Sequence, residues 1–170
     1  MTFDPAFRLY RDDPQDRPSP DIAFWDALAI EVAAELADRR SLYPSLVAKG
    51  RLSRVDADRE LRVWTAIVED VTGRPRPDGW RPSATWTEMV HALRREIGLR
   101  RTLYPRWIDA RRVDAATAWR KLDLVERWHD ILWTDCGHAE ARTARAAVAA
   151  ILAARAGDRH RTGPDRARAA

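Results

Sequence analysis

The sequence repeats itself after 61 residues. Residues 24–71 align with residues 85–132 without a gap, and eleven of the 48 aligned positions are identical, including the Leu-Tyr-Pro segments at 42–44 and 103–105. Self-similarity at a fixed spacing indicates a duplicated supersecondary unit. The chain is therefore expected to fold as two copies of one small unit, in which each copy covers the apolar face of the other.

Apolar residues in both copies follow the spacing of an amphipathic helix. Ser53 with Asp56, and Thr85 with Glu88, form capping boxes, and Asp114 stands at a helix N-cap position. Each copy is thus predicted to be an antiparallel αα-hairpin. The apolar positions of the leading helices stand three or four residues apart, at Trp25, Leu28, Val32 and Leu36 in the first copy and at Trp86, Val90, Leu93 and Ile97 in the second.

The Tyr-Pro pair is predicted to interrupt the leading helix of each hairpin. A proline lacks the backbone donor and disfavours the helical conformation in the residue before it. Short separate turns are therefore expected at 44–49 and 105–110, the first of them ended by Gly50 in the left-handed conformation. Arg111 replaces that glycine in the second copy, so the geometry of the second turn is left open.

The complete prediction is an all-α protein: two duplicated αα-hairpins with Tyr-Pro kinked corners that form a four-helix bundle, plus a C-terminal helix. Proline, glycine and charged residues mark the segments outside these elements. The predicted boundaries are a flexible N-terminal arm at 1–20, hairpins at 21–72 and 83–133, a linker at 73–82, the C-terminal helix at 134–157 and a flexible basic tail at 158–170.

Composition narrows the class of protein. Cys136 is the only cysteine, so no intramolecular disulfide forms. No apolar run approaches the roughly 20 residues of a membrane span, and the first residues lack the layout of a signal peptide. A cytoplasmic protein without membrane contact is expected.

The two copies carry opposite net charge, although the whole chain is at +4. Residues 21–72 hold ten acids and seven bases, whereas residues 83–133 hold seven acids and ten bases. The first hairpin is thus acidic and the second basic. Two interpretations stay open: the hairpins neutralise one another across their interface, or the second displays a basic surface in which Trp107 and Trp119 interleave with arginines to bind nucleic acid.

Arginines gather near the ends of both leading helices. They are candidates for gripping phosphate or an acidic partner through paired hydrogen bonds. The alternative is structural, because cations in the last turn of a helix are stabilised by its dipole. The predicted binding residues are Arg39, Arg40, Arg51, Arg100, Arg101, Arg106, Arg111 and Arg112.

Catalytic and cofactor signatures are missing from the sequence. His129, Cys136 and His138 match no standard zinc spacing, and His129 takes the seam position that Val68 holds in the first copy, which indicates a packed histidine. The sequence also has no glycine-rich phosphate loop. We therefore expect no catalytic residues, no metal, no cofactor and no enzymatic activity.

The pattern R-R-x-L-Y-P-x-x-[VI]-x-x-x-R-[LV]-[SD] resembles a group of small phage and prophage proteins of unassigned function, which usually carry one such hairpin. The resemblance covers about residues 24–132 and implies a mobile-element origin and a helical fold. It supplies no catalytic residues.

The resulting hypothesis is a non-enzymatic protein that binds a host or defence-system protein as an inhibitor or adaptor. One alternative is a nucleic-acid-binding accessory protein that uses the basic second hairpin, and another is a self-associating structural component. The sequence does not determine the oligomeric state.

Overall fold

The computed structural model describes residues 20–73, 83–134 and 139–162 of the chain, and the secondary structure in these ranges is entirely helical. The predicted all-α class is confirmed for this part of the chain. The predicted arms at 1–20 and 158–170 and the linker at 73–82 fall largely outside it. The described helices are α1 (Ile22–Ala48), α2 (Arg54–Thr72), α3 (Trp86–Asp109), α4 (Ala115–Thr134) and α5 (Ala139–Thr162).

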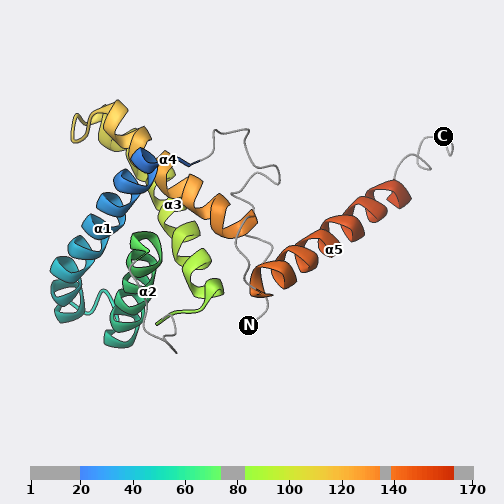
Figure 1. Cartoon of the computed structure of the whole chain (residues 1–170), viewed down its shortest axis with the longest axis horizontal. Coiled ribbons are helices and arrows are strands. Elements are labelled where there is room, and N and C mark those ends of the chain that lie inside the picture. The colour runs from blue at the N-terminus through green and yellow to red at the C-terminus, as the bar shows by residue number, and fades with distance from the viewer. Residues whose placement is uncertain (1–19, 74–82, 135–138, 163–170) are drawn as a thin grey trace, which may run out of the picture.

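Four of these helices pack as one bundle. α1 lies against α2 and α3 lies against α4, and further contacts join α2 to α3 and α1 to α4 (Figure 1). α5 touches α3 and α4 at its N-terminal end and then extends away from the bundle (Figure 1). This helix was predicted to end at residue 157, but it continues to Thr162 because Gly157 weakens a helix without terminating it.

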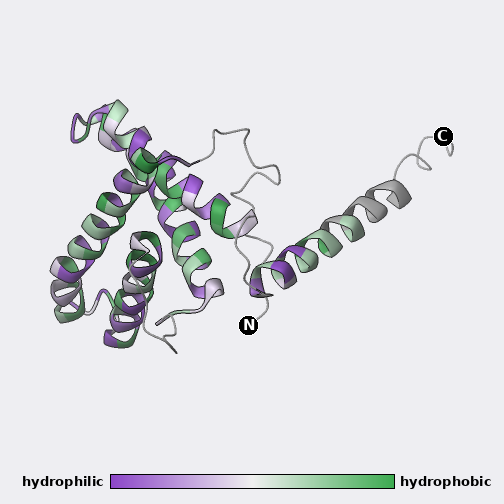
Figure 2. Cartoon of the chain, viewed as in Figure 1, coloured by the Kyte–Doolittle hydropathy of each residue, from purple (hydrophilic) through white to green (hydrophobic). Residues whose placement is uncertain are grey.

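The core lies where the four bundle helices meet. Hydrophobic and hydrophilic residues share each of these helices (Figure 2), and the predicted apolar positions face inward. Trp25 is an exception, because it is only half-buried, at the edge of the core. The fully buried side chains include Leu28, Val32, Trp64, Ile67, Met89, Val90, Leu93, Ile97, Val125 and Leu132.

The predicted helix starts are confirmed by their capping hydrogen bonds. The Ser53 hydroxyl accepts from the Asp56 amide at 3.0 Å, and the Asp114 carboxylate accepts from the Thr117 amide at 2.8 Å. Thr85 and Glu88 form the complete capping box. Side chains at these positions take up backbone donors that the first turn of a helix leaves free.

The expected interruption at Tyr-Pro is wrong. α1 continues through Pro44 and α3 through Pro105, each for four more residues. The φ angle of proline suits a helix, and its ring removes a single backbone hydrogen bond near the end of the helix. The chain turns only after this last helical turn, so the corners lie at 49–53 and 110–114 and not at the prolines.

A hydrogen-bonded cap ends α1. The Arg51 amide donates to the Leu46 carbonyl at 2.9 Å and the Gly50 amide donates to the Val47 carbonyl at 3.0 Å. This is the Schellman arrangement, which places one residue in the left-handed conformation. That residue is Gly50, with φ of 65°.

The same cap ends α3, although no glycine is present. The Arg112 amide donates to the Trp107 carbonyl at 2.8 Å and the Arg111 amide donates to the Ile108 carbonyl at 2.9 Å. Arg111 has a φ of 56°, the left-handed value that favours glycine. The two corners therefore have the same backbone geometry, and the second accommodates an arginine under strain.

Replacing Arg111 with glycine is expected to raise the free energy of unfolding by about 1 kcal/mol, because a side chain is strained in the left-handed region. Chemical denaturation measures this change. Gly50→Ala is the matched control and should lower the free energy of unfolding by a similar amount, since a Cβ at Gly50 meets no atom within 4 Å and adds only backbone strain. An unchanged value for Arg111→Gly would show that the arginine is not strained.

Candidate functional site

Two of the predicted binding arginines lie in a buried ion cluster between α1 and α3. Glu35 and Arg39, one turn apart on α1, meet Glu96 and Arg100, one turn apart on α3. Arg39 pairs with Glu35 on its own helix and with Glu96 at 2.6 Å. Arg100 pairs with Glu96 at 2.7 Å and with Glu35 at 2.6 Å. Each arginine thus joins both helices.

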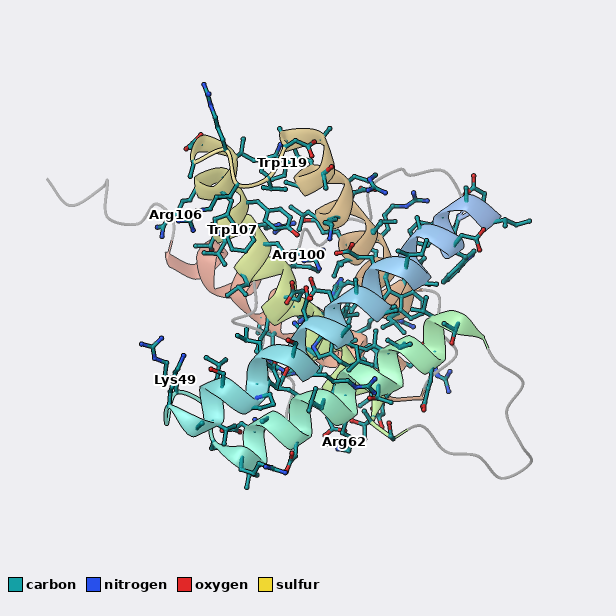
Figure 3. All side chains as sticks on the ribbon, turned by 90° about the vertical axis from the view of Figure 1, so that its left-hand side faces the viewer. Lys49, Arg62, Arg100, Arg106, Trp107 and Trp119 are labelled. Carbon is teal, nitrogen blue, oxygen red and sulfur yellow. The ribbon has the colours of Figure 1, made fainter. Side chains whose placement is uncertain are left out.

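Glu31 extends the cluster on one side. Its carboxylate lies 2.8 Å from the Arg100 guanidinium and 3.2 Å from the Lys121 ammonium of α4. The Arg100 side chain is 3% exposed, and Figure 3 shows it in the middle of the molecule. The cluster therefore connects α1, α3 and α4 in the interior.

The cluster favours the charged forms of Glu96 and Arg100. Burial alone would raise the pKa of Glu96, but Arg100 and Arg39 outweigh it and the pKa is lowered. Burial alone would lower the pKa of Arg100, but Glu96 and Glu35 outweigh it and the pKa is raised. Arg39 and Arg100 are therefore committed to internal ion pairs and do not offer a free guanidinium to a partner.

The remaining predicted arginines lie nearer the surface. Arg101 is half-buried and pairs with Glu126 at 2.7 Å. The other members are exposed at the helix ends and corners: Arg40, Arg51, Arg106, Arg111 and Arg112. The predicted set thus divides into an internal group and a surface group.

Charges of opposite sign also meet along the rest of the hairpin interface. Arg62 of α2 pairs with Glu88 of α3, and Arg95 of α3 pairs with Glu60 of α2. The hydrogen bond from Arg62 lowers the pKa of Glu88 to about 2. The Arg95–Glu60 pair agrees with the interpretation that the acidic residues 21–72 and the basic residues 83–133 neutralise one another where they touch, whereas the Arg62–Glu88 pair has the reverse sense.

A basic and aromatic surface remains at the α3–α4 corner. Trp107 and Trp119 are 37% and 46% exposed. Figure 3 places both at the same end of the molecule as Arg106, away from Lys49 of the α1–α2 corner. We call this the corner surface, and its members are Arg106, Trp107, Arg111, Arg112, Trp119 and Arg120, all of them exposed.

Two arginines at the start of α2, next to the α1–α2 corner, have carboxylate partners. Asp56 pairs with Arg59 at 2.6 Å, and Asp58 pairs with Arg54 at 3.2 Å. In the second hairpin the positions 61 residues after these two aspartates are Thr117 and Trp119. Arg120 stands 61 residues after Arg59, but Thr117 replaces the aspartate that pairs with Arg59.

The four arginines of the corner surface have no ion pair within the described ranges of the chain. Two carboxylates stand nearby, at Asp109 and Asp114. The Asp114 carboxylate is engaged as the N-cap of α4 through the Thr117 amide. The corner surface therefore displays a net positive charge beside two exposed indole rings.

His129 is a packed histidine, as predicted. It is buried, and burial lowers its pKa. Arg94 donates to its Nε2 at 3.0 Å, so Nδ1 carries the hydrogen and lies 3.2 Å from the Asp130 carboxylate. No group of three or more metal-binding side chains occurs in the described residues, while Cys136 and His138 lie outside them.

Comparison of the chain with models of protein families, with curated proteins and with solved structures finds no significant match. None of the described helices combines the length and the hydropathy needed to cross a membrane. The chemistry of the corner surface is therefore the main guide to function.

Proposed function

We propose that this chain is a non-enzymatic protein that binds an acidic macromolecule through the corner surface. The observation that carries the proposal is the combination of arginines without ion-pair partners in the described residues and two exposed tryptophans. Tryptophan and arginine are the residue types most enriched at binding hot spots. An acidic partner supplies the carboxylates or phosphates that the corner itself lacks.

The strained backbone at Arg111 supports the same surface. A left-handed non-glycine residue costs on the order of 1 kcal/mol, and such strain gathers at functional sites. Gly50 makes the same turn in the first hairpin with no such strain. An arginine at position 111 adds a positive charge to the corner surface but lowers the stability of the fold. This combination supports a role for the Arg111 charge in binding.

The resemblance to small phage and prophage proteins suggests where the partner comes from. A host or defence-system macromolecule is the proposed target, and the chain acts on it as an inhibitor or adaptor by shape and charge. Self-association through the corner surface is disfavoured, because a two-fold contact would place its arginines opposite one another.

The test is a variant that gives the second corner the residues of the first. Arg106→Ser, Trp107→Leu, Arg111→Gly and Trp119→Asp each introduce the residue found 61 positions earlier, where the same backbone accommodates it. We expect the tagged wild-type protein to retain a partner from bacterial lysate and this corner variant to lose it.

The control variant carries Arg54→Ala and Arg59→Ala, which alter the α1–α2 corner instead. It should retain the same partner as the wild-type protein. Equal recovery of the partner by the corner variant and the wild-type protein would refute the proposed surface.

A further inference from the structure

We infer that the partner of the corner surface is a single strand of nucleic acid, in which bases stack on the two tryptophans and phosphates pair with the surrounding arginines. This inference rests on the proposed function and narrows it to one chemical class of partner. Positively charged surfaces with interleaved aromatic side chains are typical of proteins that bind single strands.

Trp107 is held in place from the inside. Its ring lies 5.9 Å from the ring of Tyr104, centre to centre, at an interplanar angle of 40°. Tyr104 is buried, and the Arg100 guanidinium of the ion cluster lies over its ring at 5.8 Å. The indole is thus supported by a chain of contacts that reaches the core, while more than a third of it stays exposed. A supported ring loses little freedom when a base stacks on it.

Trp119 provides a second exposed ring on the neighbouring helix. It stands at the start of α4 in the position that Asp58 holds in α2. A charged residue at that exposed site is the ordinary choice, whereas tryptophan leaves 46% of its surface exposed to solvent there. Figure 3 shows Trp107 and Trp119 on the same end of the molecule. Two exposed rings at one end of the molecule suit stacking with bases of the same strand.

The charge of the corner suits a phosphate backbone better than a protein interface. The buried centre of a protein interface is depleted in charged residues and is largely apolar. At this corner the large apolar side chains that are exposed are Trp107 and Trp119, and four arginines stand among them. These two side chains are too few to form the apolar centre of a protein interface. Arginines bind phosphates through hydrogen bonds and do not need an apolar centre.

A duplex is disfavoured because its bases are stacked inside the helix and present no free faces. The tryptophans would then have no partner, and only the arginines would contribute. Asp109 and Asp114 reduce the net charge at the corner, so modest affinity with a marked salt dependence is expected. With at most four phosphates neutralised, the slope of log affinity against log salt is about −3 for a single strand.

Fluorescence anisotropy with labelled oligonucleotides tests the inference. The full chain is titrated into a short oligo-dT, an oligo-U and a duplex of matched length. We expect salt-dependent binding of at least one single strand and weaker binding of the duplex. Trp107→Ala and Trp119→Ala should each weaken binding by roughly tenfold, and Trp119→Phe should restore most of the loss at that position.

Arg112→Ala should weaken binding and reduce the salt slope by about 0.7. The matched control is Arg54→Ala in the α1–α2 corner, which should leave binding unchanged. Circular dichroism of every variant confirms that the helices are retained, so that a loss of binding reports on the surface.

Three outcomes would overturn the inference. The first is an affinity for the duplex that equals the affinity for the single strand and is unchanged in Trp107→Ala and Trp119→Ala. This result would mean that the protein contacts only the phosphate backbone. Capture of a nuclease-resistant protein that depends on Trp107 and Trp119, without oligonucleotide binding, would make the partner an acidic protein and would preserve the proposed function. The third outcome is that the corner variant keeps both oligonucleotide binding and protein capture, or that the wild-type protein shows neither. Either result would remove the inference and the proposed function together.

Discussion

Arg100→Ala is expected to lower the free energy of unfolding by about 3–5 kcal/mol, measured by urea or guanidinium denaturation followed by circular dichroism. The Arg100 side chain is 3% exposed and lies within 2.8 Å of three carboxylates, those of Glu31, Glu35 and Glu96. Removing it leaves these carboxylates close together in the interior with only Arg39 and Lys121 to balance them. Like charges without a counter-ion are strongly unfavourable where water cannot reach them.

Arg95→Ala is the matched control. Arg95 also pairs with a glutamate of the other hairpin, Glu60, but its side chain is 49% exposed. Solvent screens such a pair, so its loss should change the free energy of unfolding by less than about 1 kcal/mol. Equal effects of the two substitutions would contradict a desolvated cluster around Arg100 and would reopen the question of whether that arginine is free to bind a partner.

The ion cluster also explains how α1 and α3 are fixed against each other. Apolar contacts tolerate small sliding movements of one helix along another, but hydrogen bonds between charged groups require a defined geometry. Arg39 reaches Glu96 and Arg100 reaches Glu35, so a shift in either direction along the helices would break a pair. The same arrangement keeps Tyr104 under Trp107 through the Arg100 guanidinium. The core and the corner surface are thus physically connected.

Local rules predicted the helices because the causes are local. Helical periodicity identified Leu28 and Leu93 as core residues, and capping side chains such as Ser53 and Thr85 marked where helices begin. Proline was over-interpreted: its cost is one hydrogen bond and a steric preference, and the cap that follows Pro44 outweighs both. The left-handed conformation of Arg111 had one signal, its alignment with Gly50 in the repeat, although an arginine by itself gives none.

The candidate site was only partly predictable because burial depends on contacts between distant segments. Arg39 and Arg40 are neighbours in sequence, yet the first joins the internal cluster and the second is exposed. One signal was present: Glu35 and Glu96 stand four residues before the repeated arginines and are identical in both copies. Charges of opposite sign at that spacing indicate an ion pair within each helix, whereas the pairs between the helices depend on how the helices pack.

The tryptophans in the described ranges of the chain run from buried to exposed, a difference that composition could not show. Trp64 of α2 is 1% exposed, and the Arg39 guanidinium lies 3.9 Å from the centre of its ring. Trp119 is 46% exposed. The first is a structural residue that also supports the ion cluster, whereas the second is proposed to bind a partner.

Trp64→Ala is therefore expected to lower the free energy of unfolding by about 3–5 kcal/mol, because it leaves a cavity in the core and removes the ring beneath Arg39. Trp119→Ala should change it by less than about 0.5 kcal/mol, since an exposed side chain contributes little to packing. Denaturation of both variants under the same conditions gives the comparison. A large loss of stability in Trp119→Ala would mean that this indole belongs to the core, and the reduced oligonucleotide binding expected for that variant would then report on folding and not on stacking.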